Sequence, residues 1–164
     1  MQEMREPNRM MEETHHPEKR VQPGVEQWLR SYPWEDIVRT VAGYWRRPPE
    51  EIEACAAQET RALWQHEAAG PQSLCEALRL CRACQAARPF GKFECESFVI
   101  VARDMVEPWL GQMSATLAAA VITIIADYVR GGGDETEMER AANMILEKYI
   151  PPAPSGQSGS PAGL

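Results

Sequence analysis

Residues 73–95 read SLCEALRLCRACQAARPFGKFEC and hold four of the five cysteines of the chain. The apolar residues of this stretch recur every three or four positions, a spacing that places them on one side of an α-helix. We therefore predict a helix over 72–87, followed by a loop at 88–93.

The helix over 72–87 has two distinct faces when its residues are placed about 100° apart. Cys81 and Cys84 share the apolar face with the leucines, which predicts that they point into the core. Cys75 lies on the other face, beside Arg79 and Arg82, which predicts a more exposed thiol.

The same helical period continues over most of the chain in both directions. It predicts six further helices, over 24–31, 33–47, 49–69, 96–106, 109–130 and 135–149. With no convincing strand, the sequence predicts an all-α fold, a compact bundle of six or seven helices. The helix over 109–130 is apolar on nearly every side, so we expect it at the centre of the bundle.

Punctuating residues fix several helix ends. Gly131, Gly132 and Gly133 should end the central helix, and Asp134 with Glu137 reads as a capping box for the last one. The helix over 49–69 carries an apolar stripe, namely Ile52, Cys55, Ala56, Glu59, Ala62, Leu63 and His66. Trp64 lies off this stripe and is a candidate exposed contact for a partner, although such a residue more often packs under a neighbouring helix or tail.

The two ends of the chain differ in composition from its middle. Residues 1–24 carry charges of both signs without an apolar period, and residues 151–164 are uncharged and rich in Pro, Gly and Ser. Neither segment has enough apolar side chains to offset the entropy lost on ordering. We predict two disordered tails, with one all-α domain over 25–150 between them.

Charge and hydropathy exclude some functions. A net charge of −7 and a pI near 5.1 argue against broad binding to nucleic acid, which needs a positive surface. The longest apolar run, 117–126, is half the roughly 20 residues that span a bilayer, so we expect no membrane partner. An odd number of cysteines without a signal peptide indicates a cytoplasmic protein with reduced thiols.

The cysteines allow two interpretations. Packing the helices over 49–69 and 72–87 antiparallel brings Cys55 beside Cys81 and Cys84, and Cys95 could fold over them. Such a four-thiolate set would hold zinc or an iron–sulfur cluster, or act as a redox sensor. However, the spacing matches no standard cluster motif, and free cysteine is often a buried packing residue. We favour packing thiols and expect no cofactor, with a zinc or iron–sulfur site as the alternative.

Two other features are candidate sites. Cys75 lies near Arg79 and Arg82, and neighbouring cations favour the reactive thiolate, so Cys75 is the candidate reactive thiol. Arg79, Arg82, Arg88 and Lys92 form the one basic run of the chain, a candidate site for an anion or an acidic partner.

Residues 36–54 have a helix–turn–helix rhythm that resembles the start of the DNA-binding helices in replication initiators. The resemblance implies DNA binding through these helices. The following helix carries few basic residues to meet phosphates, which argues against nucleic acid as a partner.

No nucleophile set, paired-carboxylate motif or phosphate loop occurs in the sequence. The function we predict is therefore a cytoplasmic module that binds another protein, as an adaptor, assembly factor, chaperone or regulator, without catalysis. Homodimerisation through the helix over 109–130 is a further candidate interaction. The thiolate metal or redox protein is the first alternative function, and the DNA binder is the second.

Overall fold

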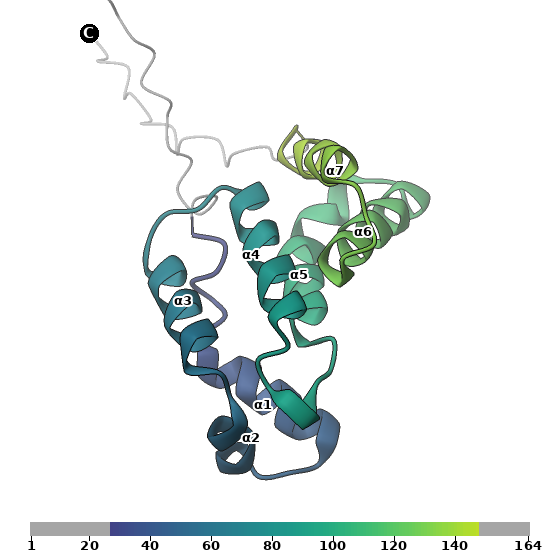
Figure 1. The fold of residues 1–164 in the computed structure, drawn as a ribbon. Coiled ribbons are helices and arrows are strands. Elements are labelled where there is room, and N and C mark those ends of the chain that lie inside the picture. The colour runs from purple at the N-terminus through teal and green to yellow at the C-terminus, as the bar shows by residue number, and fades with distance from the viewer. Residues whose placement is uncertain (1–26, 148–164) are drawn as a thin grey trace, which may run out of the picture.

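The structure, a computed structural model, describes residues 27–147 (Figure 1). Within that range the chain forms seven α-helices and two short 3-10 helices, which are α1 (Trp34–Trp45), α2 (Pro49–Cys55), α3 (Gln58–Ala69), α4 (Leu74–Ala87), η1 (Gly91–Phe93), α5 (Ser97–Val106), η2 (Glu107–Gln112), α6 (Ala115–Arg130) and α7 (Glu135–Glu147). The predicted all-α bundle is confirmed. The tails predicted over 1–24 and 151–164 lie outside the described residues.

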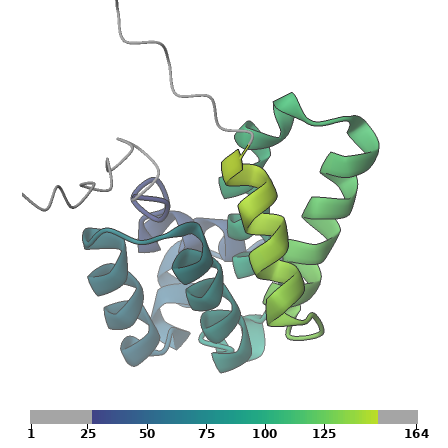
Figure 2. The same cartoon turned by 90° about the horizontal axis from the view of Figure 1, so that it is seen from above.

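The centre of the bundle is formed by α4, α5 and α6, which pack on one another. Seen from above, α1, α2 and α3 lie to one side of α4 and α5, and α6 and α7 lie to the other (Figure 2). The last helix, α7, packs against both α4 and α6. The two halves of the bundle therefore meet along α4 and α5.

An aromatic stack joins the first half of the chain to α5. The ring of Trp34 lies 5.4 Å from that of Phe90, and Phe90 lies 6.4 Å from Phe98. Trp64 packs on the other side of Phe98, with 5.4 Å between ring centroids. All four side chains are fully buried, so the stack anchors α1, α3 and the loop before η1 onto α5.

Polar caps fix where the helices begin. Ser73 accepts from the N–H of Glu76, and Glu76 accepts from the N–H of Ser73, a capping box that begins α4. Ser114 caps α6 through the N–H of Leu117. Asp134 accepts from the N–H of Thr136, so it caps the last helix as predicted, but through a bond other than those of the predicted capping box with Glu137.

The helix predicted over 24–31 is wrong for its described part, because residues 28–31 form a turn. The buried side chain of Gln72 explains the difference, since its Oε1 accepts from the N–H of Leu29 at 3.2 Å. Its amide also donates to the carbonyl of Glu67 at 2.8 Å. A hydrogen bond to a distant residue thus replaces the bonds of a helical turn.

The helix predicted over 49–69 is broken in two. Ala56 and Ala57 adopt extended conformations between α2 and α3. The N–H of Ala57 donates to the carbonyl of Pro89 at 2.7 Å, a bond that replaces the one it would make in a continuous helix. The break changes the phase of the second half, so Thr60 and Trp64 face the core.

The helix predicted over 109–130 packs at the centre of the bundle as expected, against α4, α5 and α7, but it is shorter and less covered than its sequence indicates. The helix predicted over 109–130 begins only at Ala115, after the 3-10 turn η2 that contains Pro108. It is also not the most buried helix, since 5 of the 16 residues of α6 are buried but 7 of the 10 residues of α5. The apolar side chains of the first half of α6 are only partly covered.

Candidate functional site

The five free cysteines occupy three different environments. Cys81 and Cys84 are buried in the core, Cys75 and Cys95 are half-buried, and Cys55 is exposed. The core positions of Cys81 and Cys84 agree with the faces predicted for their helix. Residues 27–147 contain no group of three or more His, Cys, Asp or Glu placed to hold a metal ion. The structure thus does not bring Cys55, Cys81, Cys84 and Cys95 together, and a metal or redox role stays a prediction.

Burial keeps the core thiols protonated. It raises the pKa of Cys84 to about 12, because a thiolate loses its hydration in the core. The pKa of Cys81 is raised further, by burial first and then by the neighbouring Cys84. At neutral pH both residues are therefore neutral packing groups.

The surroundings of Cys75 oppose the reactivity that its sequence neighbours indicate. Burial raises the pKa of the Cys75 thiol, and the cation of Arg79 lowers it. Glu135 and Glu139, contributed by α7, raise the pKa again. The acidic residues of a neighbouring helix thus offset the cation that was expected to favour the thiolate.

These shifts predict a specific dependence of stability on pH. In the unfolded chain the thiols of Cys81 and Cys84 titrate near 9.0, and folding raises both pKa values. Unfolding therefore releases their protons in alkaline solution, and the free energy of unfolding should fall above about pH 9 by about 1.4 kcal/mol per pH unit for each thiol. Urea titrations between pH 7 and pH 11 measure this slope.

The double variant Cys81→Ala, Cys84→Ala is the control for this experiment, because it retains the tyrosines, which also titrate in alkaline solution. Its stability should fall less steeply with pH than that of the wild type. Equal slopes for both proteins would show that the two thiols are not buried as described.

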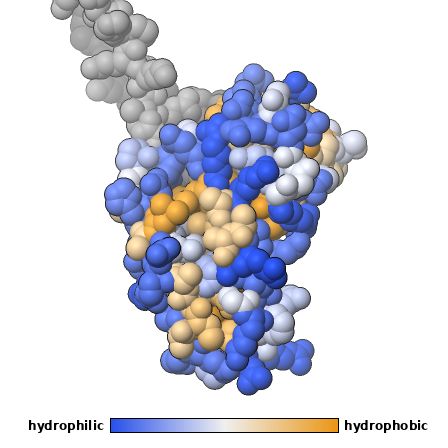
Figure 3. Space-filling view, in the orientation of Figure 1, coloured by the Kyte–Doolittle hydropathy of each residue, from blue (hydrophilic) through white to orange (hydrophobic). Residues whose placement is uncertain are grey.

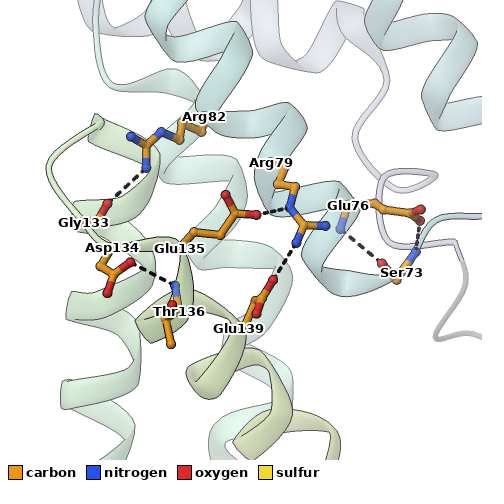
Figure 4. Close-up of polar contacts among 9 residues, drawn as sticks. All are labelled: Ser73, Glu76, Arg79, Arg82, Gly133, Asp134, Glu135, Thr136 and Glu139. Atoms are coloured by element: carbon orange, nitrogen blue, oxygen red, sulfur yellow. Dashed lines mark hydrogen bonds and ion pairs between the residues drawn. The ribbon is translucent and has the colours of Figure 1, made fainter.

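The first two residues of the basic run hold helices together (Figure 4). Arg79 bonds Glu135 at 2.6 Å and Glu139 at 2.8 Å, which ties α4 to α7. Arg82 donates to the carbonyl of Gly133 at 3.1 Å and lies 4.6 Å from the centre of the Tyr128 ring. Both guanidinium groups thus have partners within the chain. Their predicted role as an anion site stays a prediction.

The other candidates of the sequence lie apart from these two arginines. Arg88 ends α4 in a left-handed conformation, with a φ of 51°. The ammonium group of Lys92 lies 5.0 Å from the centre of the Phe93 ring. Of the two alternatives for Trp64, the structure shows packing in the core, because its side chain has 0% exposure and its Nε1 donates to the carbonyl of Tyr32 at 2.8 Å.

A cavity of about 670 Å³ opens where the C-terminal ends of α1, α4 and α6 meet the start of α5. We call it the α1–α5 groove, and its walls are Tyr44, Gln85, Ala86, Arg88, Glu94, Cys95, Glu96, Ile100 and Arg130. Tyr44 is 68% exposed and Ile100 is 39% exposed. The groove therefore combines bulky apolar side chains that solvent reaches with charged side chains.

Two exposed aromatic side chains, Tyr44 and Trp45, lie at the C-terminal end of α1. Arg46 ends the helix in a left-handed conformation. Trp45 is held in place because its Nε1 donates to the carbonyl of Glu94 at 3.3 Å and its ring contacts Phe93 edge-on. Tyr44 packs edge-on against Trp45, with 5.7 Å between ring centroids, and is otherwise open to solvent.

The charges in the groove are unevenly paired. Arg130 binds Glu96 through two hydrogen bonds of 2.6 and 3.1 Å and also contacts Asp127. Burial raises the pKa of Glu94, although a backbone N–H and the cation of Arg88 lower it in part. Arg88 itself forms no salt bridge within residues 27–147. Of the two arginines that line the groove, Arg88 is therefore the one available to pair with an acidic group of a partner.

A second cavity, of about 640 Å³, lies between α1, α2 and α3. Its charged side chains include Arg61 and Glu53, which pair at 2.6 Å. None of the exposed large hydrophobic residues lines it. The α1–α5 groove is therefore the better candidate for recognition.

The surface of α3 and α4 also carries apolar side chains, which form a strip framed by hydrophilic residues (Figure 3). Leu63 on α3 is 44% exposed. Leu63 lies outside the groove, since no residue of α3 lines it.

Comparison with known protein families, with curated proteins and with solved structures gives no match to this chain. Within the part of the chain that the structure describes, no helix is both long and apolar enough to cross a membrane.

Proposed function

We propose that this chain is a protein-binding module without catalytic activity, and that the α1–α5 groove is its docking site. One observation carries the proposal. Of the four large hydrophobic side chains exposed within residues 27–147, Tyr44 and Ile100 line the groove and Trp45 packs on Tyr44. Only Leu63 lies elsewhere.

The chemistry of the groove defines the partner segment that fits it. Aromatic residues and arginine are the side chains that contribute most at protein interfaces. Tyr44 and Ile100 would cover a bulky apolar side chain of the partner, and Arg88 would pair with a neighbouring Asp or Glu. The partner segment is therefore amphipathic and acidic next to its apolar anchor.

Five free cysteines support a cytoplasmic location, where thiols stay reduced.

Site-specific crosslinking tests the proposal. The photoreactive amino acid benzoylphenylalanine replaces Tyr44 in one variant and Leu63 in another, and each is irradiated in the cells that make the protein. We expect one protein to be captured at position 44 and not at position 63. The further substitution Arg88→Glu should abolish the capture, because it removes the cation and adds a repulsive charge.

The captured band identifies the occupant. A product of twice the mass of the chain would mean that a second copy fills the groove, and the proposed partner protein would be wrong. Capture at position 63 alone would place binding on the α3–α4 face and contradict the proposal. Capture at position 44 that is unchanged by Arg88→Glu would contradict the proposed acidic contact.

A further inference from the structure

A third cavity, of about 200 Å³, lies between residues 27–32 and the end of α5, and it shares no lining residue with the α1–α5 groove. Its walls are Gln27, Trp28, Ser31, Tyr32, Asp104, Met105, Pro108 and Trp109. Three of these eight residues are aromatic, although aromatic residues make up only 7% of the chain. The cavity is too small for a drug-sized ligand. It has room for a small head group.

The aromatic walls are held together by direct contacts. The rings of Trp28 and Trp109 lie 5.2 Å apart at an angle of 49°. Trp28 is 5% exposed, and the carbonyl of Tyr32 accepts from the buried Trp64. The turn that carries Trp28 and Tyr32 is thus fixed to the core. The cavity walls therefore need little reorganisation when a ligand enters.

The only charged residue among the walls is Asp104. Its carboxylate is close enough to Tyr32 to raise the pKa of that phenol, although burial is the larger cause. No basic residue of the described range 27–147 lines the cavity. Aromatic faces beside a single carboxylate attract a cation, because the ring faces carry negative electrostatic potential.

The indole N–H of Trp28 adds a second requirement for a ligand of this cavity. This group is buried and has no hydrogen-bond partner within the described residues. Buried donors normally have a partner, so an unsatisfied one indicates a missing acceptor. A ligand with an oxygen near its cationic group would supply it.

From these observations we infer that the Trp28–Trp109 cavity binds a methylated ammonium group, carried by a ligand that has an acceptor oxygen close to the nitrogen. Trp28, Tyr32 and Trp109 provide the aromatic faces, and Asp104 provides the counter-charge. A methylated ammonium suits these walls better than a primary amine, because it is bulky and has fewer N–H donors that need a partner. The inference does not depend on the α1–α5 groove.

Choline is the probe that tests the inference, and 3,3-dimethyl-1-butanol is its matched control. The two molecules have the same shape and the same hydroxyl group, but the second has no charge. The full chain is labelled with ¹⁵N, and the indole N–H signals of its tryptophans are followed by NMR during each titration. Single Trp→Phe substitutions assign these signals.

Choline should shift the signals of Trp28 and Trp109 in a saturable way, with a Kd on the order of 1–10 mM, and leave Trp45 unchanged. The uncharged control should bind roughly 2- to 30-fold more weakly, the range expected for a cation–π contribution. Asp104→Asn, a substitution of an exposed residue, should weaken choline binding roughly 2- to 5-fold. Asp36→Asn, at an exposed site on α1, should not.

Three results would overturn the inference. The first is the absence of a saturable shift up to roughly 100 mM choline. The second is equal affinity for the uncharged control, which would make the cavity merely apolar. The third is an unchanged choline affinity in Asp104→Asn.

Discussion

Replacing Trp64 by alanine should lower the free energy of unfolding by about 3–5 kcal/mol, among the largest effects expected of a single substitution in this chain. The ring is fully buried and packs on Phe98 at 5.4 Å. Its removal leaves a large cavity between α3 and α5. It also leaves the carbonyl of Tyr32 without the hydrogen bond of 2.8 Å that the Trp64 Nε1–H donates to it. The measurement is urea unfolding followed by circular dichroism.

Two companion variants separate the contributions. Trp64→Phe retains most of the packing but loses the hydrogen bond, so we expect a smaller loss of about 1–3 kcal/mol. Trp45→Ala removes an indole that is 41% exposed, and its cost should stay below that of Trp64→Ala. A greater loss for Trp45→Ala than for Trp64→Ala would contradict the assignment of Trp64 to the core. If Trp64→Ala is too unstable to purify, a Trp64→Phe variant as stable as the wild type would still contradict it.

Replacing Gly133 by alanine should destabilise the protein by about 1–3 kcal/mol, as overpacking does. A Cβ at this position would lie 2.9 Å from both the Cα and the N of Tyr128. These are backbone atoms of α6, so they cannot move aside as the end of a side chain can. The carbonyl of Gly133 also accepts from Arg82, which links the strain to the contact between α4 and α6.

The neighbouring glycine is a matched control for this prediction. A Cβ at Gly132 would lie no closer than 3.8 Å to another group, the carbonyl oxygen of Asp127. Gly132→Ala should leave stability unchanged or raise it by up to about 1 kcal/mol, because alanine restricts the unfolded chain. Thermal unfolding of the two variants compares them directly. Equal melting temperatures would contradict the close approach of Gly133 to α6.

Helical periodicity was enough to predict the fold class and the core face of α4. It failed at Ala56 and Ala57, because alanine favours a helix and no local signal marks a break there. The bond from Ala57 to the carbonyl of Pro89 overrides that local preference. The same missing information placed Trp64 off the apolar stripe of a continuous helix, since the burial of a residue after a break depends on where the next helix begins.

The candidate sites were predictable only in part. Arg88 and Cys95 stood out in the sequence, but the groove also needs Tyr44 and Ile100, which belong to helices far apart in the chain. The pairing of Arg79 with two glutamates of α7 was likewise hidden, because it joins residues 56 and 60 positions apart. Contacts of this kind follow from how the helices pack, and no local pattern encodes them.

The affinity of the chain for the protein captured at position 44 tests the central claim most directly. Tyr44→Ala and Ile100→Ala should each weaken binding by roughly tenfold or more, as expected of anchor residues. Leu63→Ala, which removes an apolar side chain of similar exposure outside the groove, should change the Kd by less than about twofold. If Leu63→Ala weakened binding more than Tyr44→Ala and Ile100→Ala, the α1–α5 groove would not be the docking site.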